Sequence, residues 1–424
     1  MSNNFIIKGN LIYSGINKEL NILQNGYAVC HEGICEGVFK NIPKKFKNFE
    51  IKDYKDALII PGMTDLHVHA PQYSFRGLGM DLELLEWLDV NIFPEEAKYS
   101  NISYAQKAYK IFVEDLKKST TTRACIFATI HCESTLLLMK MLEKSNLHTY
   151  VGKVNMDRNS SETLCEESAE SSLEETDRWI VKTMSKFKNT KPILTPRFVP
   201  SCSDELMRGL GIMQKKYEIP VQSHLSENLS EISWVKKLNP KSYCYGDAYD
   251  MFGLFGGSAK TLMAHCVYST EEEIELMKRN KVFIAHCPES NLNLSSGIAP
   301  IRKYLESGIN LGLGSDIAGG STLSIMKAMV YAIQASKMYW RLLDSEQKPL
   351  TFEEVFYMAT LGGGSFFGKV GTFQKGYEFD AVVLDDSDLK HPQKLSVRQR
   401  IERGAYGSEE LKIIEKYVAG NKID

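Results

Sequence analysis

A repeated alternation of apolar runs and helical patterns, between about residues 58 and 316, limits the folds open to this chain. Each unit has a short apolar run, a turn ending in polar residues and then a segment with helical spacing. Such βα units predict a parallel sheet covered by helices. Eight strands are expected, at Ala57–His69, Thr121–Ile130, Tyr150–Met156, Pro192–Pro200, Val221–Glu227, Thr261–Val267, Lys281–Pro288 and Ile309–Asp316. Eight is the strand number of a closed TIM-like (β/α)8 barrel.

The two ends of the chain have a different pattern. Phe5–Val38 and Tyr377–Leu384 contain short alternating runs broken by Gly, Asn and Lys, and no long helix is expected before Pro61. Alternation of this kind indicates half-buried strands. Leu411–Val418 instead has helical spacing, so the C-terminal part need not consist of strands alone.

The expected architecture is therefore an α/β protein with two units. Residues 61–367 are assigned to the barrel. Residues 1–60 and 368–424 together are assigned to one composite small β domain beside it.

Composition and charge narrow the class of partner. The 51 Lys and Arg residues nearly balance the 53 Asp and Glu residues, giving a net charge of −2. The protein therefore has no strong positive electrostatic field that would attract nucleic acid or an anionic membrane, and a small-molecule partner is expected. The first residues lack a signal-peptide pattern, and the nine scattered cysteines include no Cys-x-x-Cys pair. Both features favour a cytoplasmic protein.

The strongest local motif is His67-Val68-His69, at the end of the first expected strand. Residues two apart on a strand project to the same side, so the two imidazoles can meet one metal ion. A His-x-His sequence also arises by chance in a chain with nine histidines. The barrel context favours the metal interpretation, because strand ends converge on one mouth.

Three further polar residues lie at expected strand ends: His224, His265 and Asp316. A single buried histidine is more often a hydrogen-bonded core residue than a ligand. Four histidines and one aspartate from strands one, five, six and eight are hard to explain in that way. Imidazole and carboxylate ligands suit zinc or ferrous iron.

Glu227 follows His224 by three residues, where the strand is expected to turn out over the mouth. That is a natural place for a carboxylate that shuttles protons. The alternative is an acidic residue at a helix N-terminus favoured by the helix dipole. The neighbouring histidine favours the catalytic interpretation.

Some motifs carry less weight. His131-Cys132-Glu133 matches the His-x-Glu of the nucleic-acid deaminases, but the Pro-Cys-x-x-Cys that those enzymes need is absent. His286 also lies at a strand end, yet the residues after it have the composition of a turn, so it is not assigned as a metal ligand. His31, His148 and His391 lie away from the expected strand ends and carry no functional inference.

At this point the chain resembles the amidohydrolase superfamily, through Pro61-Gly62-x-x-Asp65-x-His67-x-His69, His224, His265 and Gly314-Ser315-Asp316. The order and spacing are similar to those of its mononuclear deaminases. Binuclear relatives use a carboxylated lysine on strand four, where Ile193–Phe198 has none. Lys153, on strand three, is expected to be structural or to support the site indirectly.

Within the superfamily the chain is most similar to the guanine deaminases. The similar strings are His69–Phe75, Phe127–His131, Lys191–Phe198, Gln222–Asn228 and Asn291–Gly297. The resemblance implies that His67, His69, His224 and Asp316 bind the metal. It also implies that Gln72, Arg197, Phe198 and Glu227 contact a purine. An arginine and a glutamine can complement the donors and acceptors of guanine, although Arg197 can instead be a structural ion-pair residue.

The resemblance implies hydrolysis of a C–N bond in a cyclic amidine: guanine becomes xanthine and ammonia through a metal-activated water. Asp316 is expected to accept the proton of the water, Glu227 to protonate the purine, and His265 to contact the substrate and polarise the attacking oxygen. One Zn²⁺ per subunit is expected, with Fe²⁺ as the alternative, in a cytoplasmic homodimer of purine catabolism. The alternatives are a superfamily deaminase acting on cytosine, a triazine or another heterocycle, or a non-catalytic scaffold.

Overall fold

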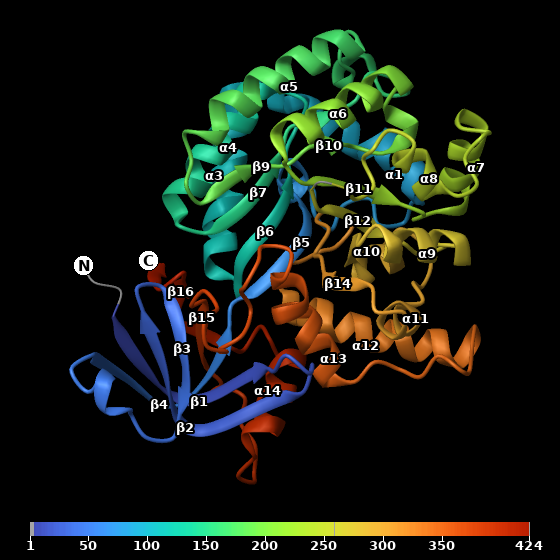
Figure 1. The fold of residues 1–424 in the computed structure, drawn as a ribbon. Helices are drawn as coiled ribbons and strands as arrows, with labels where there is room; N and C mark the ends of the chain where they lie inside the picture. Colours follow the sequence, from blue (N-terminus) through green and yellow to red (C-terminus); the bar gives the residue numbers. More distant parts are fainter. Residues whose placement is uncertain (1–3, 258, 424) are drawn as a thin grey trace.

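The computed structural model describes residues 4–257 and 259–423, and these form a barrel with a sheet beside it (Figure 1). Its parallel strands run in the orders β5-β6-β7-β9, β8-β10 and β11-β12-β13-β14. Their bounds are β5 Met63–His69, β6 Thr121–Phe127, β7 His148–Gly152, β8 Val154–Asn155, β9 Thr190–Pro192, β10 Thr195–Pro196, β11 Val221–Leu225, β12 Thr261–His265, β13 Phe283–His286 and β14 Asn310–Leu313. With β7/β8 and β9/β10 as interrupted strands, these correspond to the eight that were expected.

Backbone hydrogen bonds close the barrel. The N–H of Asp316 donates to the carbonyl of His67 at 2.8 Å, and the N–H of His69 donates to the carbonyl of Ile317 at 3.1 Å. On the other side a parallel bridge joins Leu194 to Val221. The (β/α)8 prediction is confirmed.

Helices cover the outside of the barrel (Figure 1). Ser203 and Thr270 each accept a backbone N–H group at the N-terminus of one of these helices, as serine and threonine commonly do. The helices are α1 Leu84–Trp87, α2 Phe93–Ala97, α3 Ile102–Lys118, α4 Cys132–Ser145, α5 Ala169–Met184, α6 Asp204–Tyr217, α7 Leu229–Leu238, α8 Tyr245–Asp250, α9 Glu271–Arg279, α10 Pro288–Asn293, α11 Ile301–Glu306, α12 Ile325–Leu342, α13 Phe352–Tyr357 and α14 Val397–Tyr406. None of the described helices is long and apolar enough to cross a membrane.

The second sheet combines both ends of the chain, in the order β17-β16-β15-β4-β1-β2-β3. In Figure 1 its blue N-terminal strands lie beside the red C-terminal ones. Its strands are β1 Phe5–Ser14, β2 Leu20–His31, β3 Ile34–Phe39, β4 Glu50–Pro61, β15 Ala381–Asp385, β16 Lys412–Val418 and β17 Asn421–Ile423. The domain boundaries assigned from the sequence remain a prediction, and residues 1–3 and 424 lie outside the described part.

Two local predictions were wrong. Ala57–His69 is not one strand, because β4 pairs with β1 and β15 while β5 pairs with β6. Gly62 separates them, and a Cβ there would meet Thr122 Oγ1 at 2.2 Å. The segment Leu411–Val418, expected to be a helix, is mostly strand β16. So short a segment fits both the helical and the strand spacing of apolar residues, and its pairing with β15 and β17 decides that it is a strand.

Most barrel strands end earlier than predicted. The backbone leaves the extended conformation at Ser226 (φ 47°), His265 (φ 73°) and Asp316 (φ 45°). Non-glycine residues adopt this left-handed region only at a cost, and such positions cluster at functional sites. The turned strand ends direct polar side chains across the barrel mouth.

Lys416 anchors the small sheet to the barrel. Its buried ammonium donates to the carbonyls of Leu116, Ser119 and Thr121 at 3.3, 2.9 and 3.0 Å. Burial lowers the pKa of Lys416 from 10.5 to about 7. The folded protein therefore releases this proton at a lower pH than the unfolded chain does.

Replacing Lys416 with Met tests this linkage. Between pH 7 and pH 9 the unfolded chain still holds the proton that the folded protein has lost, so rising pH favours folding. We expect the wild type to gain about 2 kcal/mol of unfolding free energy relative to the variant over this interval. Urea unfolding at both pH values measures the difference. A difference that stays constant or shrinks contradicts the prediction.

Candidate active site

The carboxyl end of β5 places two imidazoles side by side. His67 and His69 are buried, and their Nε2 atoms lie 3.2 Å apart. Asp65 accepts hydrogen bonds from the backbone N–H groups of His67 at 3.2 Å and Ser315 at 3.0 Å, and from the Ser315 hydroxyl at 2.6 Å. Asp65 thus ties β5 to the segment that leads into Asp316.

His224 and Asp316 complete this group. His224 Nε2 lies 3.3 Å from His69 Nε2, and Asp316 Oδ1 lies 3.1 Å from His67 Nε2 and 3.5 Å from His69 Nε2. The 2.6 Å contact between His224 Nδ1 and the Arg197 carbonyl requires an Nδ1–H donor, which leaves Nε2 with a free lone pair. Burial lowers the pKa of all three histidines, so they are neutral at pH 7.

The donor set fits one transition-metal ion. Four ligands at about 2.0–2.1 Å around a tetrahedral zinc ion lie about 3.3 Å from one another. The nitrogen–nitrogen and nitrogen–oxygen separations above are 3.1 to 3.5 Å. Two overlapping groups of side chains, His67 with His69 and His224, and His67 with His265 and Asp316, bring their ligand atoms together within 4.8 Å.

His265 and Glu227 form a second pair beside this centre. His265 Nε2 lies 3.4 Å from Glu227 Oε2 and 3.7 Å from Asp316 Oδ2, while its Nδ1–H donates to Asn291 Oδ1 at 2.9 Å. Burial opposes the charged imidazole, but the carboxylates of Glu227 and Asp316 outweigh it and raise the pKa of His265. Burial also raises the pKa of Glu227 to about 7, despite a 2.9 Å hydrogen bond from Ser296. Glu227 can therefore both hold and release a proton near neutral pH.

Glu231 orients the segment that carries Glu227. Its Oε2 accepts from the backbone N–H groups of Glu227 at 3.0 Å and Asn228 at 3.3 Å, and its Oε1 accepts from the Tyr245 hydroxyl at 2.8 Å. Glu231 and Asn228 form a capping box at the start of α7. The helix start thereby holds Glu227 in place.

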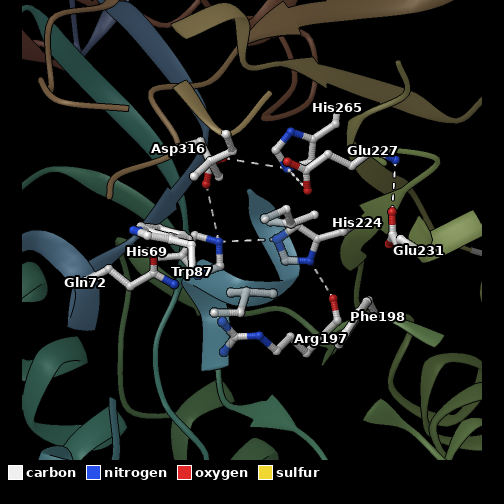
Figure 2. Close-up of a pocket in the computed structure, with 13 residues that line it drawn as sticks. His69, Gln72, Trp87, Arg197, Phe198, His224, Glu227, Glu231, His265 and Asp316 are labelled. Carbon is white, nitrogen blue, oxygen red and sulfur yellow. Dashed lines mark hydrogen bonds and ion pairs between the residues drawn. The ribbon is translucent and has the colours of Figure 1, made fainter. Parts of the chain in front are cut away.

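These side chains surround a cavity that opens to solvent (Figure 2). In this view Arg197 and Gln72 lie across the cavity from His265 and Glu227. Its apolar lining is Leu84, Trp87, Leu88, Phe198 and Leu294. The four residues His67, His69, His224 and Asp316 are called the metal-type centre below. The cavity thus has this centre and the pair of Glu227 and His265 on one side, and the amide of Gln72 and the guanidinium of Arg197 on the other.

The structure brings together all the site residues expected from the sequence. Those around the cavity or its metal-type centre are His67, His69, Gln72, Arg197, Phe198, His224, Glu227, His265 and Asp316. His286 is buried at the end of β13, and burial lowers its pKa to about 3. It belongs to neither ligand group found among the described residues. Lys153 is buried and paired with Glu166.

Sequence reasoning missed Glu96 and Glu231. Glu96 binds both Gln72 and Arg197, although the sequence Phe93-Pro94-Glu95-Glu96 gives no sign of it. Glu231 had a usable signal, since Asn228-x-x-Glu231 is a capping-box spacing.

Comparison with known proteins places this site in a family. The model of the amidohydrolase family matches residues 58–421. The guanine deaminase of Dictyostelium discoideum is 38% identical over 379 residues, covering 88% of this chain and 83% of the relative. The guanine deaminase of Escherichia coli strain K12 is 31% identical and covers 95% and 92%.

A solved structure is similar along its whole length. The crystal structure of guanine deaminase from C. acetobutylicum, with guanine bound in its active site, has a TM-score of 0.96 to this chain. The two are 51% identical, and the match covers 99% of this chain and 100% of the other. The chain therefore belongs to the amidohydrolase family and, within it, to the guanine deaminases.

Proposed function

We propose that this protein hydrolyses guanine to xanthine and ammonia. The observation that carries the proposal is the arrangement of two functional groups across one cavity: the metal-type centre with Glu227 and His265, and the Arg197 and Gln72 donors opposite them. The cavity combines apolar walls with converging polar groups, as small-molecule sites do.

We assign His67, His69, His224 and Asp316 as the residues that hold the metal, because their donor atoms have the separations of a tetrahedral set. Nitrogen and carboxylate donors suit Zn²⁺, the metal we propose, and also Fe²⁺. When bound, the metal supplies a Lewis acid that lowers the pKa of water and polarises the reacting centre.

Two side chains are assigned to proton transfer and a third to stabilising the attacking oxygen. Asp316 Oδ2 faces His265, and we assign it as acceptor of the proton that water loses as its oxygen bonds to C2 of guanine. Glu227, with its pKa of about 7, delivers a proton to the ring nitrogen beside C2. As the C2–N bond breaks, Glu227 helps transfer to the amine the proton that Asp316 took from water, and it regains its own proton from the C2 hydroxyl, which becomes the carbonyl of xanthine. His265, held by Asn291, stabilises the attacking oxygen through Nε2.

Substrate recognition is assigned to the opposite side of the cavity and to its wall. Arg197 and Gln72 offer N–H donors and a carbonyl acceptor to the polar edge of the purine. Phe198, buried and 6.3 Å from Trp234 between ring centroids, gives an apolar wall for the ring. Glu227 and His265 contact the amine-bearing edge.

An assay of ammonia release across guanine, guanosine, cytosine, adenine and an aminotriazine tests the substrate. A site that hydrogen-bonds particular groups strongly rejects analogues lacking them, so we expect kcat/KM for guanine to exceed that for the others by about 10³ or more. Faster turnover of cytosine or the triazine would support the alternative heterocycle deaminase. Absence of activity from the metal-loaded protein on every base would support a scaffold.

The proposal includes a cytoplasmic homodimer in purine catabolism. The nine cysteines form no disulfide in the described part of the chain, which suits a reducing compartment. Elemental analysis of the purified protein decides between zinc and iron.

A further inference from the structure

Glu96 joins the two residues assigned to the polar edge of the purine. It lies in the short helix α2 and is 1% exposed. Gln72 Nε2 donates to Glu96 Oε1 at 2.7 Å. Arg197 donates through Nη1 to Oε2 at 2.6 Å and through Nη2 to Oε1 at 3.1 Å. One buried carboxylate thus binds an amide and a bidentate guanidinium.

These contacts determine which end of the Gln72 amide faces which way. Gln72 Oε1 accepts from the backbone N–H of Ala318 at 3.0 Å, while Nε2 donates to Glu96. Turning the amide over would place an NH₂ group against an N–H donor and an oxygen against a carboxylate, so both hydrogen bonds would be lost. Gln72 therefore offers the cavity one remaining N–H and one remaining lone pair in a fixed order.

Glu96 also changes what Arg197 can attract. The guanidinium lies 5.2 Å from the centroid of the Phe93 ring, so α2 provides both the carboxylate and an aromatic face for it. The ion pair cancels the charge of Arg197. Nη1 also donates to Met156 Sδ at 3.9 Å, which leaves the Nε–H and the second Nη2–H for a ligand. A compensated guanidinium favours a neutral carbonyl, whereas an uncompensated buried cation favours an anion.

We propose that Glu96 is a positioning and charge-compensating residue that makes the cavity select an uncharged purine over a purine anion. This inference rests on the proposed function. Xanthine has a carbonyl in place of the guanine amine and loses a proton more readily. The same compensation therefore disfavours the ionised product and assists its release.

Glu96→Gln tests the proposal with probes that differ in charge. Urate carries a negative charge at pH 7, whereas hypoxanthine is neutral, and both are used as inhibitors of ammonia release from guanine. We expect kcat/KM for guanine to fall about tenfold or more, because one buried donor loses its acceptor. We also expect the urate-to-hypoxanthine ratio of inhibition constants to fall about tenfold or more, because the variant leaves a cation unpaired.

Glu95→Gln is the matched control. Glu95 is the adjacent buried carboxylate of α2, but it pairs with Lys98 at 2.6 Å and with Tyr104 rather than with the cavity residues. We expect this variant to stay within about twofold of the wild type on both measures, since its partners lie outside the cavity. The proposal is overturned if Glu96→Gln has the wild-type ratio of urate to hypoxanthine inhibition constants and turns over guanine as the Glu95→Gln control does.

Glu96→Asp separates positioning from charge if Glu96→Gln does not fold. It keeps the negative charge but shortens the reach to Gln72, so we expect a wild-type inhibition ratio with lowered kcat/KM. Unchanged kcat/KM in this variant overturns the positioning role. If the wild type releases no ammonia from guanine, the proposed function fails. Calorimetric binding of urate and hypoxanthine then still measures the charge selectivity.

Discussion

Glu227→Gln will keep its metal and lose about 10²–10⁴-fold in kcat for guanine. The side chain keeps its size, and Glu227 is not among the metal-type ligand groups, so the metal centre stays intact. The amide cannot exchange a proton with the purine, whereas the carboxyl group has a pKa of about 7. Steady-state ammonia release and metal content per chain are the two measurements.

Glu289→Gln provides the control for this substitution. Glu289 is also a buried glutamate near the barrel mouth, but it pairs with Ser321 and does not line the cavity. Its variant should keep both metal and turnover. Retention of wild-type kcat in Glu227→Gln would remove Glu227 from the proton transfers and leave His265 as the alternative donor.

His67→Ala will lose metal and activity together. His67 Nε2 lies within 3.2 Å of both His69 Nε2 and Asp316 Oδ1, so removing it opens the centre of the ligand set. Three donors of a four-donor site hold a metal much less tightly. Mass-spectrometric metal analysis after dialysis, together with ammonia release, measures both losses.

His286→Gln is the matched histidine control. His286 is equally buried at a strand end, but it lies outside both ligand groups. We expect this variant to retain about one metal ion per chain, with only modest loss of activity, because no ligand is removed. An active, metal-free His67→Ala protein would disprove the assigned site.

Much of the fold can be predicted from short segments of the sequence. Apolar runs followed by capped helical segments predict the barrel, because strand and helix periods depend on neighbouring residues. The predictions for Leu411–Val418 and for Ala57–His69 were wrong because they rested on local patterns alone. Their local patterns fit more than one structure, and pairing partners far away in the chain decide which structure forms.

The sequence by itself predicted the barrel, and it indicated the candidate metal-binding residues at the barrel mouth. His-x-His spacing and polar strand ends suffice, because parallel strands must deliver their carboxyl ends to one mouth. Only the tertiary structure decided which charged and polar groups contact the residues at that mouth. Glu96 meets Arg197 across 101 residues, and Asp65 meets Ser315 across 250. Such contacts leave no periodic trace, since charge pairing and desolvation depend on which groups lie close together in space rather than along the chain.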